Sequence, residues 1–521
     1  MPVQSKFMRT NFRILYLLFA ITVSSCSTSR IAKRDNGKIE IVFVQVNDVY
    51  EIAPIAGGKE GGMARVATLK KQQQQKNPNT FLIMAGDFLS PSVYNSLQYL
   101  GKRIRGKQMV EVMTVAGTDL AVFGNHEFDI TESELQERLN ESQFSWVSSN
   151  AFHKKAGKVT AFEKIQGGKV IPIPDRYILR VRDADGTTAN IGVIGLTLPF
   201  NKADYVSYTD PIQTAKKIYN ELKDSCDAII AITHQLIQDD IKLAQELPGL
   251  ASILGGHEHD MRFEKVGNVV ITKAHANARS AYLVNLKLNK KKKETDVSTS
   301  LKYLNEEVAL DSLTNLHVGK WSKIATDNYG TIGFDAAKIV MNSGEPLDGR
   351  ETEVRSKSTN FTRLIAEAIA DAAPLADVAL MNSGSIRVDD MLPAPISQYD
   401  IIRSLPFGGG IVEADIKGRL LIKTLDAGRK NIGIGGFLIS HPIQFDEVKN
   451  VWTIKGNTID ATKTYRVALT DFLFSGKEAN LDFLQKNNPD IVKAYEPESS
   501  VKSPKSDIRL AVIRYMEKKY K

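Results

Sequence analysis

The chain has 521 residues, of which 42% are hydrophobic and 25% are charged, and its formal net charge is +8. This composition is that of an ordinary globular protein and excludes an intrinsically disordered chain, and the length allows two or three domains with full-sized cores. The positive charge is dispersed, and its one dense cluster, Lys290–Lys293, has few aromatic residues nearby, so we expect no binding to a nucleic-acid polymer.

The N-terminus has the pattern of a secretory signal. Basic residues precede the apolar stretch Ile14–Val23, and small residues follow it. That stretch is too short to predict a membrane-spanning helix. We therefore predict a signal peptide over residues 1–25 and a polar tether over residues 26–37.

The residues at the end of this signal, Val23-Ser24-Ser25-Cys26, resemble a bacterial lipobox. The resemblance implies that Cys26 becomes the lipidated first residue of the mature protein. The protein would then be exported and anchored to a membrane of the cell envelope, in the periplasm or on the outer surface. A plain signal peptide with an incidental cysteine is the alternative. The only other cysteine is Cys226, so acylation of Cys26 would leave no disulfide within the chain.

Strand-like and helix-like segments alternate over residues 38–302, which is typical of an α/β domain. Residues 303–335 are charged and look helical, so we expect them to link this domain to a second one. The second domain, residues 336–521, has its own α/β pattern, with a predicted helix over Asn360–Ala372 and a predicted strand over Val378–Met381.

Five short apolar runs in the first domain each end on residues of types that bind metal ions. Runs rich in Val, Ile and Phe predict buried strands, and the carboxyl ends of such strands are where α/β proteins gather their chemistry. The residues at the five ends are Asn47-Asp48, Gly86-Asp87, Asn125-His126-Glu127-Phe128-Asp129, His234 and His257-Glu258-His259. Aspartate, asparagine and histidine from five strand ends predict a site for two divalent cations.

Each of these signals is weak alone, because a single buried histidine or a Gly-Asp pair is often only structural. Local features support the set as a whole. A bridging carboxylate usually lies on a tight turn beside glycine, as Asp87 does. His257 and His259 are spaced so that both can reach a site from one loop. Asn125 offers a neutral oxygen ligand, and His126 can face a substrate instead of a metal.

In this order the five segments resemble the calcineurin-like metallophosphoesterases, and more closely the 5′-nucleotidase family of that group. Gly61-Gly62-Met63-Ala64-Arg65 also resembles the Gly-Gly-x-Ala-Arg segment of the family. The resemblance covers nearly all of the chain after the signal. It implies an α/β fold with an N-terminal four-layer αββα sandwich and a second, C-terminal α/β domain that binds substrate. It also implies a metal-dependent phosphoric monoester hydrolase.

The same resemblance implies a role for each motif residue. Its six metal ligands are Asp48 and His259 for one ion, Asn125, His234 and His257 for the other, and Asp87 as the bridge between them. Its catalytic dyad is His126 and Asp129. In that dyad the carboxylate orients the imidazole and keeps it cationic toward the charge that develops on the phosphoryl group.

The first motif departs from the family pattern. The family usually reads Asn-Asp-x-His, with the histidine as a ligand, whereas Tyr50 occupies that position here. A neutral phenol is a poor zinc ligand, so we expect Tyr50 to hydrogen-bond a metal-bound water or the substrate; ligation as a phenolate is the alternative. The identity of the two divalent ions therefore stays open among Mn, Zn, Mg and Fe. His275 follows a strand near the site, and we expect it to lie behind the ligands or in the core.

Segments of the second domain resemble the nucleotide-binding domain of the same family, among them Asn382-Ser383-Gly384-Ser385-Ile386-Arg387. The resemblance implies that Arg355, Asn382 and Arg387 hold the phosphate and sugar of the substrate, a task that suits the fixed donor fork of arginine. Phe437 matches an aromatic residue that stacks on the nucleobase.

The family has a second stacking aromatic residue, which we expect in the segment from Ser475 to Phe483. Leu481 occupies the expected position, or Phe483 substitutes for it with a shift of register. A one-sided clamp should bind nucleotides more weakly, which leaves the substrate open.

These interpretations lead to one leading function and two alternatives. The leading one is an exported, lipid-anchored phosphohydrolase of nucleotide catabolism that removes the phosphate from 5′-nucleotides through a metal-activated water. Because the base clamp is altered, the first alternative is a hydrolase of nucleotide sugars, 2′,3′-cyclic nucleotides or another phospho- or sulfur ester. Tyr50 motivates a catalytically dead nucleotide-binding envelope protein, although the intact ligand set argues against it. We expect a monomer or a dimer.

Overall fold

The computed structural model describes residue 1 and residues 35–200, 203–498 and 500–521. The predicted signal peptide after its first residue, the predicted lipidation site Cys26 and most of the predicted tether lie outside the described residues. In the described part of the chain, no helix combines the length and the apolar character that a membrane crossing requires.

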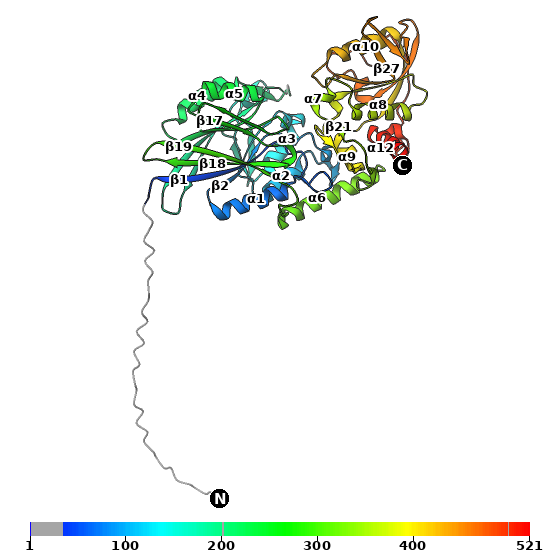
Figure 1. Cartoon of the computed structure of the whole chain (residues 1–521). Helices are drawn as coiled ribbons and strands as arrows, with labels where there is room; N and C mark the ends of the chain where they lie inside the picture. Colours follow the sequence, from blue (N-terminus) through cyan, green and yellow to red (C-terminus); the bar gives the residue numbers. More distant parts are fainter. Residues whose placement is uncertain (2–34, 201–202, 499) are drawn as a thin grey trace.

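Two six-stranded sheets form the centre of a first lobe, which ends with helix α6 (Ser312–Thr331) (Figure 1). The first sheet has the order β19 (Glu294–Tyr303), β18 (Ser280–Asn289), β1 (Lys38–Val46), β2 (Thr80–Ala85), β5 (Leu120–Val122) and β6 (Ser145–Trp146). The second has the order β11 (Arg176–Arg182), β12 (Thr188–Thr197), β14 (Ala228–His234), β15 (Ser252–Gly256), β17 (Val269–Lys273) and β16 (Arg262–Val266). The central strands of each sheet run parallel, which brings their carboxyl ends to one edge.

The side chains of β1 show why this strand lies in the middle of the lobe. Ile39, Ile41 and Phe43 pack in the apolar core between the two sheets. Val44 and Val46 point the other way and pack beneath the helices. Because both faces of the strand are buried, its sequence is a nearly continuous apolar run.

Helices cover the outer faces of both sheets. Together with α6, the helices over the first sheet are α1 (Met63–Lys76), α2 (Lys107–Ala116) and α3 (Glu132–Glu141). Those over the second sheet are α4 (Pro211–Leu222) and α5 (Ile237–Glu246). The order helix, sheet, sheet, helix confirms the predicted αββα sandwich.

Helix α6 lies within the predicted linker, residues 303–335. Its Trp321 is fully buried, with its ring centroid 5.1 Å from that of Tyr99 in the first lobe. The helix is therefore part of the layer that covers the first sheet. The domain boundaries at 302/303 and 335/336 stay predictions.

The second lobe is built on a five-stranded sheet. Its order is β26 (Leu438–His441), β22 (Val378–Asn382), β30 (Thr464–Thr470), β25 (Ile411–Lys417) and β31 (Ile491–Ala494). Helices α8 (Asn360–Ala372) and α12 (Ile508–Lys519) pack on one face, and α10 (Gly418–Lys430) packs on the other. The predicted helix over α8 is confirmed residue for residue, and β22 extends the predicted strand by one residue to Asn382.

Short elements complete both lobes. In the first lobe they are β3 (Gln98–Tyr99), β4 (Lys102–Arg103), β7 (Ala151–Lys155), β8 (Lys158–Thr160), β9 (Glu163–Gln166), β10 (Lys169–Pro172) and β13 (Val206–Tyr208). In the second lobe they are β20 (Ile339–Met341), β21 (Leu347–Asp348), α7 (Glu351–Val354), β23 (Met391–Leu392), β24 (Ile396–Ser397), α9 (Gln398–Ser404), β27 (Ile443–Asp446), β28 (Val451–Ile454), β29 (Asn457–Thr458) and α11 (Asp471–Phe474).

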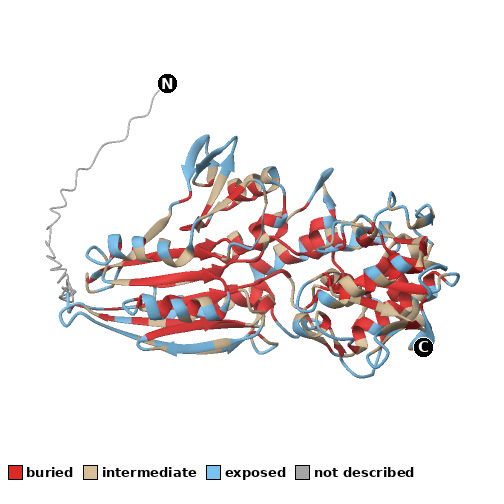
Figure 2. Ribbon diagram, turned by 90° about the horizontal axis from the view of Figure 1, so that it is seen from above, coloured by how far each residue is buried: buried red, intermediate tan, exposed pale blue. Residues whose placement is uncertain are grey.

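The two lobes contact each other directly. The hydroxyl of Tyr399 in the second lobe donates a hydrogen bond to the buried carboxylate of Glu51, and Arg279 pairs with Asp390 at 3.1 Å. Buried residues run through both lobes (Figure 2), and one apolar cluster extends from the first into the second. Because Glu51 lies just beyond β1, the carboxyl ends of the parallel strands face the second lobe.

Candidate metal centre and active site

The residues predicted to bind metal ions lie together at the carboxyl ends of the parallel strands. Asp48 follows β1, Asp87 follows β2 and Asn125 follows β5 in the first sheet. His234 ends β14 and His257 follows β15 in the second sheet. The two sheets thus supply opposite sides of one site, as the motif order predicts.

The backbone of the site is held in an unusual conformation. Asp48, Asp87 and His257 have φ angles of 53°, 55° and 89°, in the left-handed region that residues other than glycine seldom adopt. Strain of this kind is typical of functional sites, where the surrounding structure enforces it. Gly86 has no room for a side chain, since a Cβ there would lie 2.5 Å from His234 Nδ1. The sheets can therefore approach this closely only with glycine before Asp87.

Asp87 lies at the centre of the site and is 1% exposed. One carboxylate oxygen lies 3.0 Å from His234 Nε2. The other accepts a hydrogen bond of 2.8 Å from the backbone N–H of His126. The ligand atoms of Asp87, His234 and His257 all lie within 4.8 Å of one another, which is a spacing that one metal ion can span.

Asp48 is fully buried and faces the same centre. Its Oδ1 lies 3.6 Å from His259 Nε2 and 3.9 Å from His234 Nε2. Its Oδ2 accepts hydrogen bonds from Asn47 Nδ2 at 2.7 Å and from the backbone N–H of His257 at 2.9 Å. The loops after β1 and β15 are therefore fastened together through one carboxylate.

The donor set fits divalent cations. Burial alone would lower the pKa of His234, yet the carboxylates of Asp87 and Asp48 raise it to about 10. The two buried carboxylates are thus stabilised by positive charge nearby, and a divalent metal ion supplies more of it than a proton does. His234 Nδ1 hydrogen-bonds the backbone oxygen of Ala85 at 2.8 Å, which leaves Nε2 free to coordinate. Asn125 Oδ1 is also buried, and it has no hydrogen-bond partner among the described residues.

His126 and Asp129 form the pair that the sequence predicts. Both lie on one turn of 3₁₀ helix, His126–Asp129, and His126 Nδ1 lies 2.6 Å from Asp129 Oδ2. Burial would lower the pKa of His126, but the carboxylates of Asp87 and Asp129 outweigh it and raise the pKa above its ordinary value. The imidazole is therefore biased toward its cationic form beside the metal site.

Tyr50 reaches into the same site. Its hydroxyl lies 3.3 Å from Asp48 Oδ1, 3.4 Å from Asp87 Oδ2 and 3.0 Å from His259 Nε2. Burial and the neighbouring carboxylates raise the pKa of Tyr50 well above its usual value, so it is held as a neutral phenol. A neutral hydroxyl between two carboxylates acts as a hydrogen-bond donor to them. Its predicted contact with a metal-bound water or the substrate stays a prediction.

His275 lies beside the site without joining the ligand set. Its Nδ1 hydrogen-bonds with Ser280 Oγ at 2.9 Å, and its ring centroid lies 5.8 Å from that of Tyr303. These contacts place it at the end of the sheet behind His259, because Ala276 donates its backbone N–H to the His259 oxygen at 2.8 Å.

Glu127 has a structural role that the sequence reasoning missed. It is fully buried and accepts hydrogen bonds from four backbone N–H groups. These belong to Asp87 (2.8 Å), Phe88 (2.8 Å), Leu89 (2.9 Å) and Gly124 (2.6 Å). One carboxylate thus joins the loop that carries Asp87 to the loop that carries Asn125. The signal in the sequence was an acidic residue inside an otherwise apolar and ligand-rich motif.

The substrate-binding residues predicted in the second lobe surround the carboxyl end of β22. Asn382 is the last residue of that strand, and Phe437 immediately precedes its partner β26. The backbone oxygen of Phe437 accepts a hydrogen bond from Ser383 N, and that of Arg355 accepts one from Gly433 N. The four predicted residues Arg355, Asn382, Arg387 and Phe437 therefore come from one cluster of loops.

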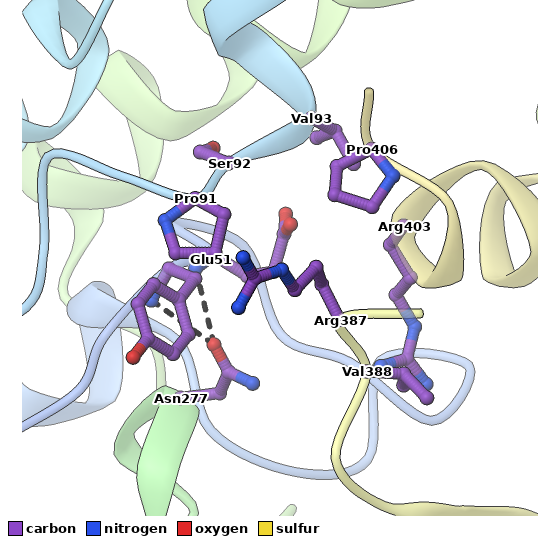
Figure 3. Close-up of a pocket in the computed structure, with 10 residues that line it drawn as sticks. Glu51, Pro91, Ser92, Val93, Asn277, Arg387, Val388, Arg403 and Pro406 are labelled. Carbon is purple, nitrogen blue, oxygen red and sulfur yellow. Dashed lines mark hydrogen bonds between the residues drawn. The ribbon is translucent and has the colours of Figure 1, made fainter. Parts of the chain in front are cut away.

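Arg387 lies between the two lobes. Together with Arg403 and Pro406 it lines a small cavity whose other wall is formed by Tyr50, Glu51 and Asn277. Figure 3 shows the Arg387 guanidinium reaching from the second lobe toward Glu51 and Pro91 of the first. The arginine thus stands at the entrance to the metal site, close enough for its charge to oppose protonation of His126.

Leu481, which occupies the expected position of the second stacking residue, is buried. That side chain is 0% exposed and belongs to the core between the sheet and α10, so it offers no face to a ligand. Phe483 lines a groove along α10, where Lys423 Nζ lies 3.9 Å from its ring centroid.

Phe472 is a better placed aromatic residue, and the sequence reasoning missed it. It follows β30, whose parallel register pairs Leu469 with Leu380 of β22, and its side chain is 44% exposed. Phe437 and Phe472 therefore flank Asn382 from the two neighbouring strands. Glu478 lies at the same end of the sheet, where its carboxylate accepts a 2.6 Å hydrogen bond from Asn382 Nδ2.

Comparisons with known proteins agree with this architecture. Residues 41–261 match the calcineurin-like phosphoesterase family, and residues 337–485 match the 5′-nucleotidase C-terminal domain. Protein UshA of Escherichia coli K12 is 25% identical over 93% of this chain and 98% of its own length. A 5′-nucleotidase of Bos taurus is 24% identical over 80% of this chain and 78% of its own. The crystal structure of a 5′-nucleotidase precursor from Thermus thermophilus covers 92% of this chain and 97% of its own, with a TM-score of 0.68 and 21% identity.

The fold, the cluster of ligand-type residues and the two family matches together define this protein as a metal-dependent phosphoesterase. The chain belongs to the 5′-nucleotidase family of calcineurin-like phosphoesterases, which confirms the resemblance of its motifs. Enzymes of this family use divalent metal ions, and the residues at the strand ends fit such ions.

The four hydrogen bonds of Glu127 lead to a test of what holds the site together. Glu127→Gln turns one acceptor into a donor that faces backbone N–H groups, and each buried N–H left without a partner costs about 1–3 kcal/mol. We expect the free energy of unfolding to fall by about 2 kcal/mol or more, with a loss of bound metal. Chemical denaturation and metal analysis of the same preparation measure both.

Glu40→Gln is a matched control, because Glu40 is an exposed residue of β1 that lies 4.0 Å from Lys287. Surface substitutions of this kind change stability by less than about 0.5 kcal/mol. Equal unfolding midpoints for the two variants would contradict the structural role of Glu127.

Proposed function

We propose that this protein is an exported dinuclear-metal phosphohydrolase that removes the phosphate from 5′-nucleotides. One observation supports this above all: the six ligand-type residues at the strand ends face the loop of the second lobe that carries Arg387. A phosphate placed between them would touch metal ions on one side and a guanidinium on the other.

The residues of the chain divide the work as follows. Bound divalent ions would stabilise charge on the phosphoryl oxygens and lower the pKa of a water nucleophile. Cationic His126 faces the same space, stabilises the negative charge of the transition state and donates a proton to the leaving alkoxide. Asp129, 2.6 Å from His126 Nδ1, orients the ring so that Nε2 faces the substrate. Arg387 binds the phosphate from the other side.

The surroundings of Asn382 support a nucleoside as the leaving group. Phe437 and Phe472 flank this residue from neighbouring strands, and aromatic faces stack on any nucleobase. The carboxylate of Glu478, at the same strand end, suits the hydroxyls of a ribose. Phe437 and Phe472 would form a two-sided clamp on the base, which supports a nucleotide substrate.

A substrate panel tests this proposal. Metal-stripped protein is assayed with AMP, UDP-glucose, 2′,3′-cyclic AMP and an aryl phosphate, after addition of Mn²⁺, Zn²⁺ or Mg²⁺ in turn. We expect no turnover without metal and the highest kcat/KM with AMP. A higher kcat/KM for UDP-glucose or the cyclic nucleotide would replace the proposal by the corresponding hydrolase. Absence of turnover with all four would support a protein that only binds nucleotides.

The same substrate panel, applied to Phe472→Ala, tests whether this residue stacks on the base. Stacking on one aromatic side chain is worth about 1–3 kcal/mol, so we expect KM for AMP to rise about 5- to 150-fold, with little change for the aryl phosphate. Phe483→Ala is the matched control and should leave both values unchanged. An equal effect of the two variants would place the base elsewhere.

The dyad is tested by His126→Ala. If His126 acts only in the transition state, kcat falls about 10²–10⁴-fold while KM and the metal content stay the same. Asp129→Asn should act in the same direction but less, because the ring is misoriented rather than removed. His317→Ala is the control, since this histidine pairs with Glu111 at 2.7 Å on the outer helices. Loss of metal from His126→Ala, with rescue by excess metal, would make His126 a ligand and refute the dyad.

Export and anchoring belong to the proposal as well. The lipobox-like segment before Cys26 supports lipidation of that residue. We expect Cys26→Ala to move the protein out of the membrane fraction or to leave the signal uncleaved, as judged by cell fractionation and mass spectrometry. A cleaved variant that still fractionates with membranes would rule out an anchor at Cys26.

A further inference from the structure

His259 contacts both lobes through its two ring nitrogens. Nε2 faces the metal site, where it lies 3.0 Å from the Tyr50 hydroxyl and 3.6 Å from Asp48 Oδ1. Nδ1 faces the opposite way and lies 2.6 Å from Asp389 Oδ2. Asp389 belongs to the second lobe, so a residue predicted to bind metal in one lobe is held by a carboxylate from the other.

The carboxylate of Asp389 is fixed on both sides. Its Oδ1 accepts a hydrogen bond of 2.5 Å from the backbone N–H of Glu351 at the start of α7, while its Oδ2 contacts His259. The backbone of Asp389 has a φ of 40°, in the left-handed region. A side chain held at both oxygens on a constrained backbone can orient the ring that it contacts.

The segment around Asp389 links the lobes at several points. Arg387, two residues earlier, points into the cavity between the lobes, and Asp390 pairs with Arg279 at 3.1 Å. Arg279 Nη2 in turn lies 3.5 Å from the backbone oxygen of His259. The loop that carries the proposed phosphate contact thus also contacts a proposed metal ligand.

We propose that Asp389 is a positioning residue for His259, so that the second lobe completes the metal site of the first. A carboxylate on the outer nitrogen fixes the tautomer with a proton on Nδ1, leaves the Nε2 lone pair directed at the metal and increases its basicity. The inference rests on the proposed role of His259 as a metal ligand. It adds that metal affinity on the Asp48 side depends on contact between the lobes.

A reciprocal consequence follows from linkage. If docking of the second lobe strengthens metal binding at His259, then metal bound there favours the docked arrangement by the same factor. In the docked arrangement of this structure, Arg387 lines the cavity beside the metal site. The Asp389–His259 contact thereby couples the loading of one metal position to the placement of the phosphate-binding arginine.

Direct metal binding tests the proposal without any substrate. Apoprotein is titrated with Co²⁺ against a chelator of known affinity, and the visible d–d spectrum reports the ligand field of each ion. We expect two ions in the unaltered protein. In Asp389→Ala one ion should bind about 10- to 100-fold more weakly with an altered spectrum, and the other should be unchanged. Asp389→Asn, which keeps an acceptor but loses the charge, should fall between the two.

Asp390→Ala is the matched control. It removes the neighbouring ion pair with Arg279 but leaves the Asp389–His259 contact, so both Co²⁺ affinities should be retained. Native affinities in Asp389→Ala, or equal weakening in Asp390→Ala, would overturn the positioning role. An unaltered protein that binds fewer than two ions would instead overturn the proposed dinuclear function and the inference with it.

Discussion

The site depends on the burial of two carboxylates side by side. Asp48 and Asp87 are 0% and 1% exposed and come from adjacent strands of one sheet. Charges removed from water and placed beside a like charge are costly unless a cation compensates them. Histidines from the second sheet line the same space, and the pKa of His234, raised to about 10, shows how strongly the pair attracts positive charge. The two buried carboxylates and the histidines around them therefore form a site that suits divalent metal ions.

In the proposed function, metal binding and substrate recognition belong to different lobes. In the first lobe, Glu127 joins the loops that carry Asp87 and Asn125 through four backbone hydrogen bonds. The second lobe offers arginines, aromatic rings and a carboxylate around the end of β22. One short loop, which carries Arg387 and Asp389, reaches across and contacts the surroundings of the metal site.

Local sequence patterns predict some parts of the site, and contacts between distant segments decide the others. The ligand-type residues were predictable, because parallel strands bring their carboxyl ends to one edge whatever the details of packing. Helix α8 was predictable because its apolar face repeats with the helical period and its end is capped by Thr359. The surroundings of Leu481 were not predictable, because neighbouring positions in a turn can point inward or outward, and only packing against α10 decides between them. Phe472 and Glu127 were missed because no spacing rule distinguishes them from core residues.

The sequence by itself determined that the site binds metal ions, because five predicted strands each end on residues of types that bind metals. The order of these five motifs can be read directly along the chain. The sequence also determined the two-domain α/β character through the periodicity of its apolar residues. The tertiary structure alone decided which groups meet across large separations in the chain. The hydroxyl of Tyr50 hydrogen-bonds with His259, and Asn382 donates a hydrogen bond to Glu478. The carboxylate of Asp389 contacts the ring of His259. Such contacts depend on how two sheets and two lobes pack, and packing is a property of the whole fold that no local pattern contains.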